Sequence, residues 1–176
     1  MTVHTFNESS RFEDRCEATG VALWLFKSMW GHEFIRSDRI RNKAQQKAGT
    51  DHMIHLRDRT LRVDLKYRRP KFDGTDLLVE VESSKGRIGW GIDPSKENDL
   101  VIWVFMGPCL AFVVPRLALL TAAVPNWQDW GPLREAKNDS WVTRFVTPSV
   151  GTLAKAMGRS IRARRFPQRY REALDG

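Results

Sequence analysis

Apolar positions near the start of the chain recur with the period of a helix. The positions that set this stripe are Phe12, Cys16, Leu23, Phe26 and Trp30. Residues 7–10 supply N-cap candidates and Gly31 supplies an end, so the pattern predicts a helix over about 10–30. Gly20 is a weak point in its middle.

Alternation of apolar and charged residues then predicts strands. Residues 61–68 alternate without a break, and residues 51–56 precede them across a short turn, so the two segments form a hairpin. Residues 77–82 alternate in the same way and are expected to be the third strand of a meander. Residues 37–48 are polar and basic, which fits either a loop or a short helix.

The second half of the chain contains a run of apolar residues and several shorter segments. Residues 100–105 are apolar throughout, which is typical of a strand buried on both faces. We expect further strands over 110–114 and 141–146 and helices over 116–124 and 149–157. These elements predict one α/β domain over residues 1–176, with a mixed central β-sheet flanked by helices.

Composition narrows the class of protein. The chain has 176 residues, of which 41% are hydrophobic, and this is enough for one domain with a real core. Its two cysteines form neither a zinc motif nor a disulfide framework. The start of the chain does not resemble a signal peptide, and the apolar runs are too short to span a bilayer. We therefore expect a cytoplasmic protein without a membrane segment.

The net charge is +8 and favours an anionic partner, with nucleic acid the first candidate and an anionic membrane surface the second. Residues 151–176 form a basic C-terminal segment with seven Lys or Arg against two acids. The arginines expected to contact nucleic-acid phosphates are Arg159, Arg162, Arg164, Arg165, Arg169 and Arg171. The alternative is a solvated terminal helix or a disordered basic tail.

Candidate chemistry lies in the hairpin. Asp51 precedes its first strand, and Asp64 and Lys66 lie on the polar face of its second strand, roughly 6.6 Å apart along it. A hard divalent cation prefers carboxylate and carbonyl oxygens, which Asp51, Asp64 and the Leu65 carbonyl would supply. Lys66 would hold an attacking water or stabilise developing charge. The alternative is an ordinary solvated strand face.

The order of a Glu in the first helix, then residues 49–51 (Gly-Thr-Asp), then residues 63–66 (Val-Asp-Leu-Lys) resembles the PD-(D/E)XK nuclease superfamily. Thr50 stands where that motif has Pro. A Glu-bearing strand, the pair Gly89-Trp90 and the segment 98–103 resemble a subset of phage and bacterial members. The resemblance covers roughly residues 10–114.

This resemblance implies a restriction-endonuclease-like core (αβββαβ) and a metal-dependent DNA endonuclease, in a host-defence, phage or repair role. Asp51 and Asp64 match its Mg²⁺ or Mn²⁺ ligands and Lys66 its catalytic lysine. Glu17 is the first choice for the helix acid and Glu13 the alternative.

Glu80 is a further candidate ligand, although a solvated or salt-bridged role is the simpler interpretation. Cutting both strands of a duplex commonly uses two sites, so a homodimer is one expected arrangement. Two other functions compete with the nuclease. The chain would be an inactive nucleic-acid-binding or assembly module on a nuclease scaffold, or a protein-interaction domain.

Overall fold

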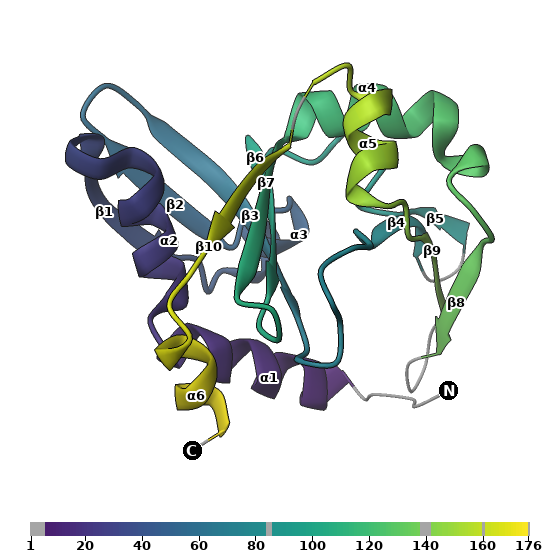
Figure 1. Cartoon of the computed structure of the whole chain (residues 1–176). Helices are drawn as coiled ribbons and strands as arrows, with labels where there is room; N and C mark the ends of the chain where they lie inside the picture. Colours follow the sequence, from purple (N-terminus) through teal and green to yellow (C-terminus); the bar gives the residue numbers. More distant parts are fainter. Residues whose placement is uncertain (1–5, 84–85, 138–141, 160, 176) are drawn as a thin grey trace.

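The computed structural model describes residues 6–83, 86–137, 142–159 and 161–175 (Figure 1). Its larger sheet has six strands in the order β1 (Phe34–Arg39), β2 (His52–Leu56), β3 (Thr60–Arg68), β6 (Leu100–Phe105), β7 (Leu110–Pro115) and β10 (Arg162–Arg165). A second sheet has the order β5 (Arg87–Ile88), β4 (Val79–Ser83), β9 (Val142–Val146) and β8 (Arg134–Lys137). The helices are α1 (Phe6–Ala18), α2 (Val21–Trp30), α3 (Lys43–Lys47), α4 (Arg116–Asn126), α5 (Val150–Ala156) and α6 (Arg169–Asp175), with 3-10 turns η1 (Gly31–Glu33) and η3 (Trp127–Asp129).

The larger sheet is mixed, which confirms the expected α/β class. Strand β2 is antiparallel to both β1 and β3, β3 and β6 are parallel, and β7 is antiparallel to both β6 and β10. Strand β6 is apolar throughout because both of its faces are buried. Its alternate residues enter different cores, with Ile102 on one face of the sheet and Trp103 on the other, and both are fully buried.

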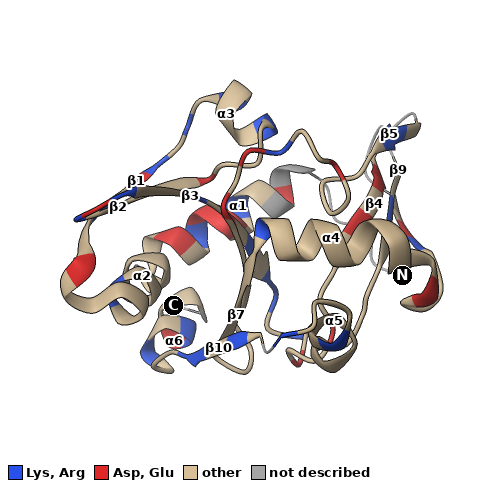
Figure 2. Ribbon diagram, turned by 90° about the horizontal axis from the view of Figure 1, so that it is seen from above, with Lys and Arg blue, Asp and Glu red and all other residues tan. Residues whose placement is uncertain are grey.

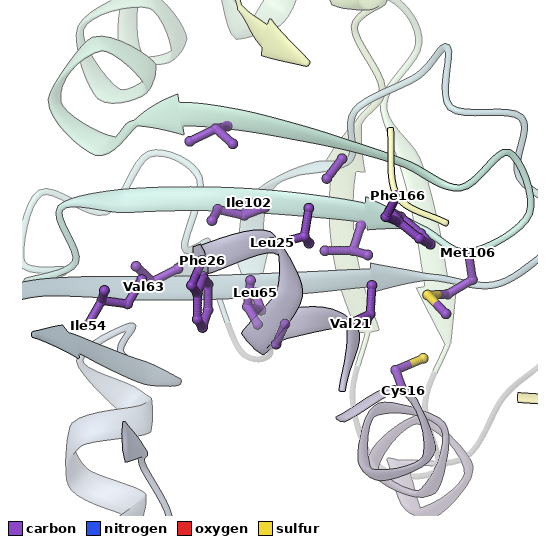
Figure 3. Close-up of a cluster of buried hydrophobic side chains, with 14 of the residues drawn as sticks. Cys16, Val21, Leu25, Phe26, Ile54, Val63, Leu65, Ile102, Met106 and Phe166 are labelled. Atoms are coloured by element: carbon purple, nitrogen blue, oxygen red, sulfur yellow. The ribbon is translucent and has the colours of Figure 1, made fainter. Parts of the chain in front are cut away.

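The first core lies between the sheet and α2 (Figure 3). Val21, Leu25 and Phe26 of α2 are fully buried there, against Val63 and Leu65 of β3. The second core lies on the opposite face, where the second sheet, α4 and α5 cover β6 and β7. Each face of the larger sheet therefore has its own layer, and Figure 1 shows these two layers on either side of it.

The helix predicted over 10–30 is in fact two helices. Gly20 has φ 79, in the left-handed region, and the chain turns there between α1 and α2. This break lets α2 lie on the sheet while α1 runs along one end of it (Figure 1). Arg15 of α1 donates to the Leu174 carbonyl, so α6 packs beside α1.

Two strand predictions need correction. Residues 77–82 were expected to extend the meander, but β4 pairs with β5 and β9 in the second sheet. Strand β6 occupies the position beside β3 and forms a parallel pair with it. Residues 34–39, part of them expected in a loop or short helix, form β1. Most of its side chains are exposed, so the sequence shows no alternation there.

The basic segment contains the terminal helix that was one alternative for it, together with a strand that was not expected. Residues 162–165 pair with β7 as an edge strand, and α6 follows.

The helices predicted over 116–124 and 149–157 correspond to α4 and α5, and the Ser149 side chain caps α5 by accepting from the Thr152 N–H. In the part of the chain that the structure describes, no helix has both the length and the apolar character needed to cross a membrane.

Candidate functional site

The hairpin of β2 and β3 brings Asp51 and Asp64 together. His52 pairs with Val63, so Asp51 is the cross-strand neighbour of Asp64. The Asp51 N–H donates to the Val63 carbonyl at 2.9 Å, and one Asp51 carboxyl oxygen accepts from the Leu65 N–H at 2.9 Å. The Asp64 carboxyl group acts on that of Asp51 both by its charge and by hydrogen bonding, and both effects raise the pKa of Asp51. The two acids predicted to share a cation therefore point toward one another.

Lys66 lies beside Asp64 on the same face of β3, and Asp51, Asp64 and Lys66 together are called the acid cluster below. Its ammonium lies 2.8 Å from an Asp64 carboxyl oxygen, and Asp64 is only 4% exposed. The ammonium is also 4.7 Å from the centre of the Trp90 ring, which packs against Trp103. The alternation of β3 thus places Asp64 and Lys66 as predicted, but in a largely enclosed position and not on a solvated face.

The electrostatics of the cluster follow from its burial. Burial raises the pKa of Asp51 to about 8, and the neighbouring Asp64 charge adds to this while Lys66 opposes it. Burial alone would lower the pKa of Lys66, but the charges of Asp64 and Asp51 outweigh it and the pKa is raised. Near neutral pH Lys66 is therefore an ammonium, and Asp51 retains a proton in the absence of a cation.

The two helix acids are held differently. Glu17 accepts hydrogen bonds from the Tyr67 hydroxyl at 2.5 Å and from His52 Nε2 at 3.1 Å. Burial acts to raise the pKa of Glu17, but hydrogen bonds to His52 and Tyr67 and the charge of His52 lower it. Glu17, the first choice from sequence, is therefore already engaged by two partners on the α2 side of the sheet.

Glu13 is the helix acid whose pKa responds to the charges of the acid cluster. Burial raises the pKa of Glu13, the charge of Lys66 opposes this, and that of Asp64 adds to it. Asp64 and Lys66 therefore act on the Glu13 carboxylate directly. Of the two helix acids, Glu13 is the one that the structure brings into the field of the cluster.

Glu80 approaches the cluster from the second sheet. Burial raises the pKa of Glu80, and the charges of Lys66 and Lys96 oppose this. Ser83 and the Trp90 backbone also hydrogen-bond to its carboxylate. The sequence indicated Glu80 only by its place on the polar face of a strand, and the structure puts it within reach of the Lys66 charge.

Arg116, at the start of α4, is a neighbour that the sequence did not indicate. It is 5% exposed and donates to the carbonyls of Gly91 and Asp93, at 3.1 and 2.6 Å. Burial lowers its pKa, while the charges of Asp64 and Asp93 act against that. No sequence motif surrounds Arg116, so only its position after a buried strand offered any signal.

The Gly-Trp loop before β6 covers the cluster. Gly91 lies so close to β4 that a Cβ there would come 2.6 Å from the Glu80 carbonyl oxygen. Further along the loop, the Glu97 N–H donates to the Ala48 carbonyl at 2.8 Å, and the Asp99 carboxylate accepts from the Arg62 N–H at 2.7 Å. The first bond holds the loop against the segment that leads into Asp51, and the second holds it against β3.

The donor set suits a hard cation in part. Asp51 and Asp64 offer carboxylate oxygens, and the Leu65 carbonyl points to the same edge of β3 as the Leu65 N–H that Asp51 accepts. Among the described residues, no group of three or more His, Cys, Asp and Glu side chains is arranged to hold a metal ion. A cation would therefore be held by two carboxylates, a backbone oxygen and water, as is common for Mg²⁺.

The predicted phosphate-binding arginines lie apart from this cluster. Figure 2 shows basic residues along β10 and on α6, and β6 and β7 separate β10 from β3. Arg162, Arg164 and Arg165 are exposed. Arg171 donates to the Gly107 carbonyl at 3.3 Å, and Arg169 donates to the Tyr170 hydroxyl at 3.3 Å. The structure does not bring these side chains to Asp51 and Asp64.

Comparison of the chain with protein-family models, with curated proteins and with solved structures gave no match in any of the three.

Proposed function

We propose that the chain is a metal-dependent phosphodiesterase that acts on nucleic acid, with DNA the favoured substrate and a restriction-endonuclease-like core. The observation that carries this proposal is the geometry of three side chains. Asp51 is the cross-strand neighbour of Asp64, whose charge raises the pKa of Asp51, and the Lys66 ammonium lies 2.8 Å from Asp64. Two carboxylates beside a fixed ammonium suit a site that receives a cation and a phosphate oxygen together.

The arrangement of elements supports the same class. Helices α1 and α2 precede three antiparallel strands, β1, β2 and β3, and the next strand of that sheet, β6, is parallel to β3. This agrees with the αβββ part of the expected core. The chain departs from that core between β3 and β6, where β4, β5 and the Gly-Trp loop stand in place of a helix.

Each residue has a defined part in the proposed reaction. A bound Mg²⁺ or Mn²⁺ would neutralise phosphate charge and acidify the attacking water. Asp51 and Asp64 would hold the cation, and the Leu65 N–H fixes the Asp51 carboxylate in position. Lys66 would stabilise charge on the phosphate oxygens or orient the water, and Glu13 is the helix acid proposed to orient water from the opposite side.

The first prediction concerns Asp64→Asn. It is expected to lower metal-dependent cleavage by at least about 100-fold, because it removes a charged ligand that no neighbour replaces. Plasmid, linear duplex, single-stranded DNA and RNA are incubated with Mg²⁺, Mn²⁺ or EDTA, and products are resolved on gels. Nicks without double-strand breaks at low protein concentration would argue against a homodimer that cuts both strands.

Asp58→Asn is the matched control, because Asp58 lies exposed in the turn of the same hairpin and, among the described residues, forms an ion pair only with Arg59, at 4.0 Å. It is expected to cleave like the wild type. Salt-sensitive DNA binding without cleavage by the wild type would favour the inactive binding module instead. Absence of both binding and cleavage would favour a protein-interaction domain.

The second prediction separates Glu13 from Glu17. Glu13→Gln is expected to lower cleavage at least about tenfold with little change in Tm, because Glu13 is exposed and its carboxylate is affected by the charges of Lys66 and Asp64. Glu17→Gln is expected to lower the free energy of unfolding by about 1–2 kcal/mol, because it weakens the bonds from His52 and Tyr67. Cleavage rate and Tm are measured on both variants, and the reverse pattern would restore Glu17 as the helix acid.

A further inference from the structure

A cavity of about 330 Å³ lies on the opposite face of the larger sheet from Asp64. Leu61 of β3 lines it, and alternation along the strand puts Leu61 and Asp64 on different faces. The other walls come from the C-terminal end of α2, from β6 and β7, and from β10 with the residues before it. The cavity is therefore separate from the acid cluster and shares no lining residue with it.

Four arginines line this cavity, namely Arg59, Arg159, Arg162 and Arg164, and no acidic residue does so in the part of the chain that the structure describes. Within the described ranges, no ion pair is formed by Arg159, Arg162 or Arg164, and Arg59 reaches only Asp58, at 4.0 Å. Four positive charges around one cavity repel one another unless an anion lies between them. The planar guanidinium fork binds phosphate oxygens in pairs, which makes phosphate a fitting anion.

The remaining lining is apolar, and Trp30 and Met29 are its largest members. Trp30 is half-buried and packs against Phe26 with ring centroids 6.2 Å apart, so its ring is held in place. Aromatic and apolar walls accept the flat face of a nucleobase. Small-ligand pockets have volumes of about 300–1,000 Å³, so this cavity, at about 330 Å³, has the size of a pocket for one small ligand such as a nucleotide.

We propose that this cavity binds a single nucleotide, with its phosphate on the guanidinium groups and its base against the wall of Trp30 and Met29. The nucleotide is either a free mononucleotide or the phosphorylated end of a nucleic-acid strand. The proposal does not depend on the chemistry of Asp51 and Asp64. It assigns these arginines to a bounded cavity, in place of general contact with a duplex backbone.

Strand β10 offers a matched pair of variants. Arg162 pairs with Val113 and Arg164 with Ala111, whose side chains belong to the core on the α2 face. Arg165 pairs with Leu110, which packs in the core on the other face, and Arg165 does not line the cavity. Arg164 and Arg165 are therefore neighbouring exposed arginines of β10 that project from opposite faces of the sheet.

Binding is measured with full-length protein and fluorescently labelled adenosine monophosphate, by anisotropy in EDTA so that no cleavage occurs. The wild type and Asp64→Asn are expected to bind equally, which separates this site from the proposed nuclease. Arg162→Ala and Arg164→Ala are expected to weaken binding at least about tenfold each, and Arg165→Ala less than about twofold. Arg162→Lys keeps the charge without the fork and is expected to be intermediate.

Competition identifies the source of the nucleotide. A 5′-phosphorylated oligonucleotide that competes as well as the mononucleotide, while its 5′-hydroxyl counterpart does not, indicates a strand end. Competition by the mononucleotide alone indicates a free nucleotide. The proposal is overturned if the wild type does not bind the probe, if Arg162→Ala and Arg165→Ala weaken binding equally, or if inorganic phosphate or oleate competes as well as the nucleotide. Thermal unfolding of each variant confirms that it is folded.

Discussion

Asp51→Asn is expected to abolish metal-dependent cleavage and at the same time to make the protein more stable above pH 8. The asparagine can accept from the Leu65 N–H, as Asp51 does at 2.9 Å, and can donate to the Asp64 carboxylate. It therefore reproduces the protonated form of Asp51 without its charge. A side chain that lowers stability in the absence of a cation and raises activity in its presence is typical of a functional site.

The pH dependence follows from the pKa of Asp51. Burial and Asp64 raise that pKa from an ordinary 3.8 to about 8, so the folded chain retains a proton that the unfolded chain has lost. The contribution of this proton to stability is fully present below about pH 4 and is lost as the pH rises through about 8. The wild type therefore loses stability over this interval, and the Asn variant does not lose it from this group.

Urea unfolding in EDTA at pH 4, 6 and 9 measures the difference. At pH 9 the variant is expected to be more stable by at least about 1 kcal/mol, which corresponds to about 2–4 °C in Tm for a chain of this size. At pH 4 the two curves should coincide. Mg²⁺ is expected to raise the Tm of the wild type only, because the variant lacks the charge that binds it. A gap of the same size at every pH would show that Asp51 does not hold the extra proton.

Local sequence was sufficient to predict the pairing of Asp51, Asp64 and Lys66. All three lie on one short hairpin, where strand alternation sets the face and the turn sets the register. The local sequence could not decide whether Glu13 or Glu17 is the helix acid of the site. The two lie one turn apart on a shared helix face, and their surroundings depend on where α1 meets the end of the sheet after the break at Gly20.

Partners that are distant in sequence account for most of the wrong predictions. Residues 77–82 have the alternation of a strand, but nothing within them says that β6 will pair with β3 and leave β4 to a second sheet. The exposed edge strand β1 lacks any periodic signal. The approach of Glu80 and Arg116 to the cluster depends on the same long-range packing, so sequence alone could not reveal their surroundings.

Among variants of the acid cluster, Lys66→Met is expected to lower the free energy of unfolding the most. The ammonium is 2.8 Å from Asp64, and its charge also lowers the pKa values of Asp51, Glu13 and Glu80. Removing one partner of a fully buried ion pair typically costs about 3–5 kcal/mol, and here Asp64 is buried while the Lys66 side chain is 31% exposed, so the low end of this range applies. We expect a loss of about 3 kcal/mol at pH 8, together with loss of cleavage. Lys27→Met, on the exposed side of α2, is the control and should change neither.

The double variant Lys66→Met with Asp51→Asn tests whether this loss is electrostatic. If uncompensated carboxylates cause the instability, removing one of them should restore at least about 1 kcal/mol beyond the gain that Asp51→Asn gives alone. Cleavage should stay absent in the double variant, because it lacks both a ligand and the ammonium. Additive changes in the free energy of unfolding would mean that Lys66 does not stabilise the fold by compensating the charge of Asp51. The two carboxylates and the ammonium would then not act as one unit, and the proposed cation site would lose its main support.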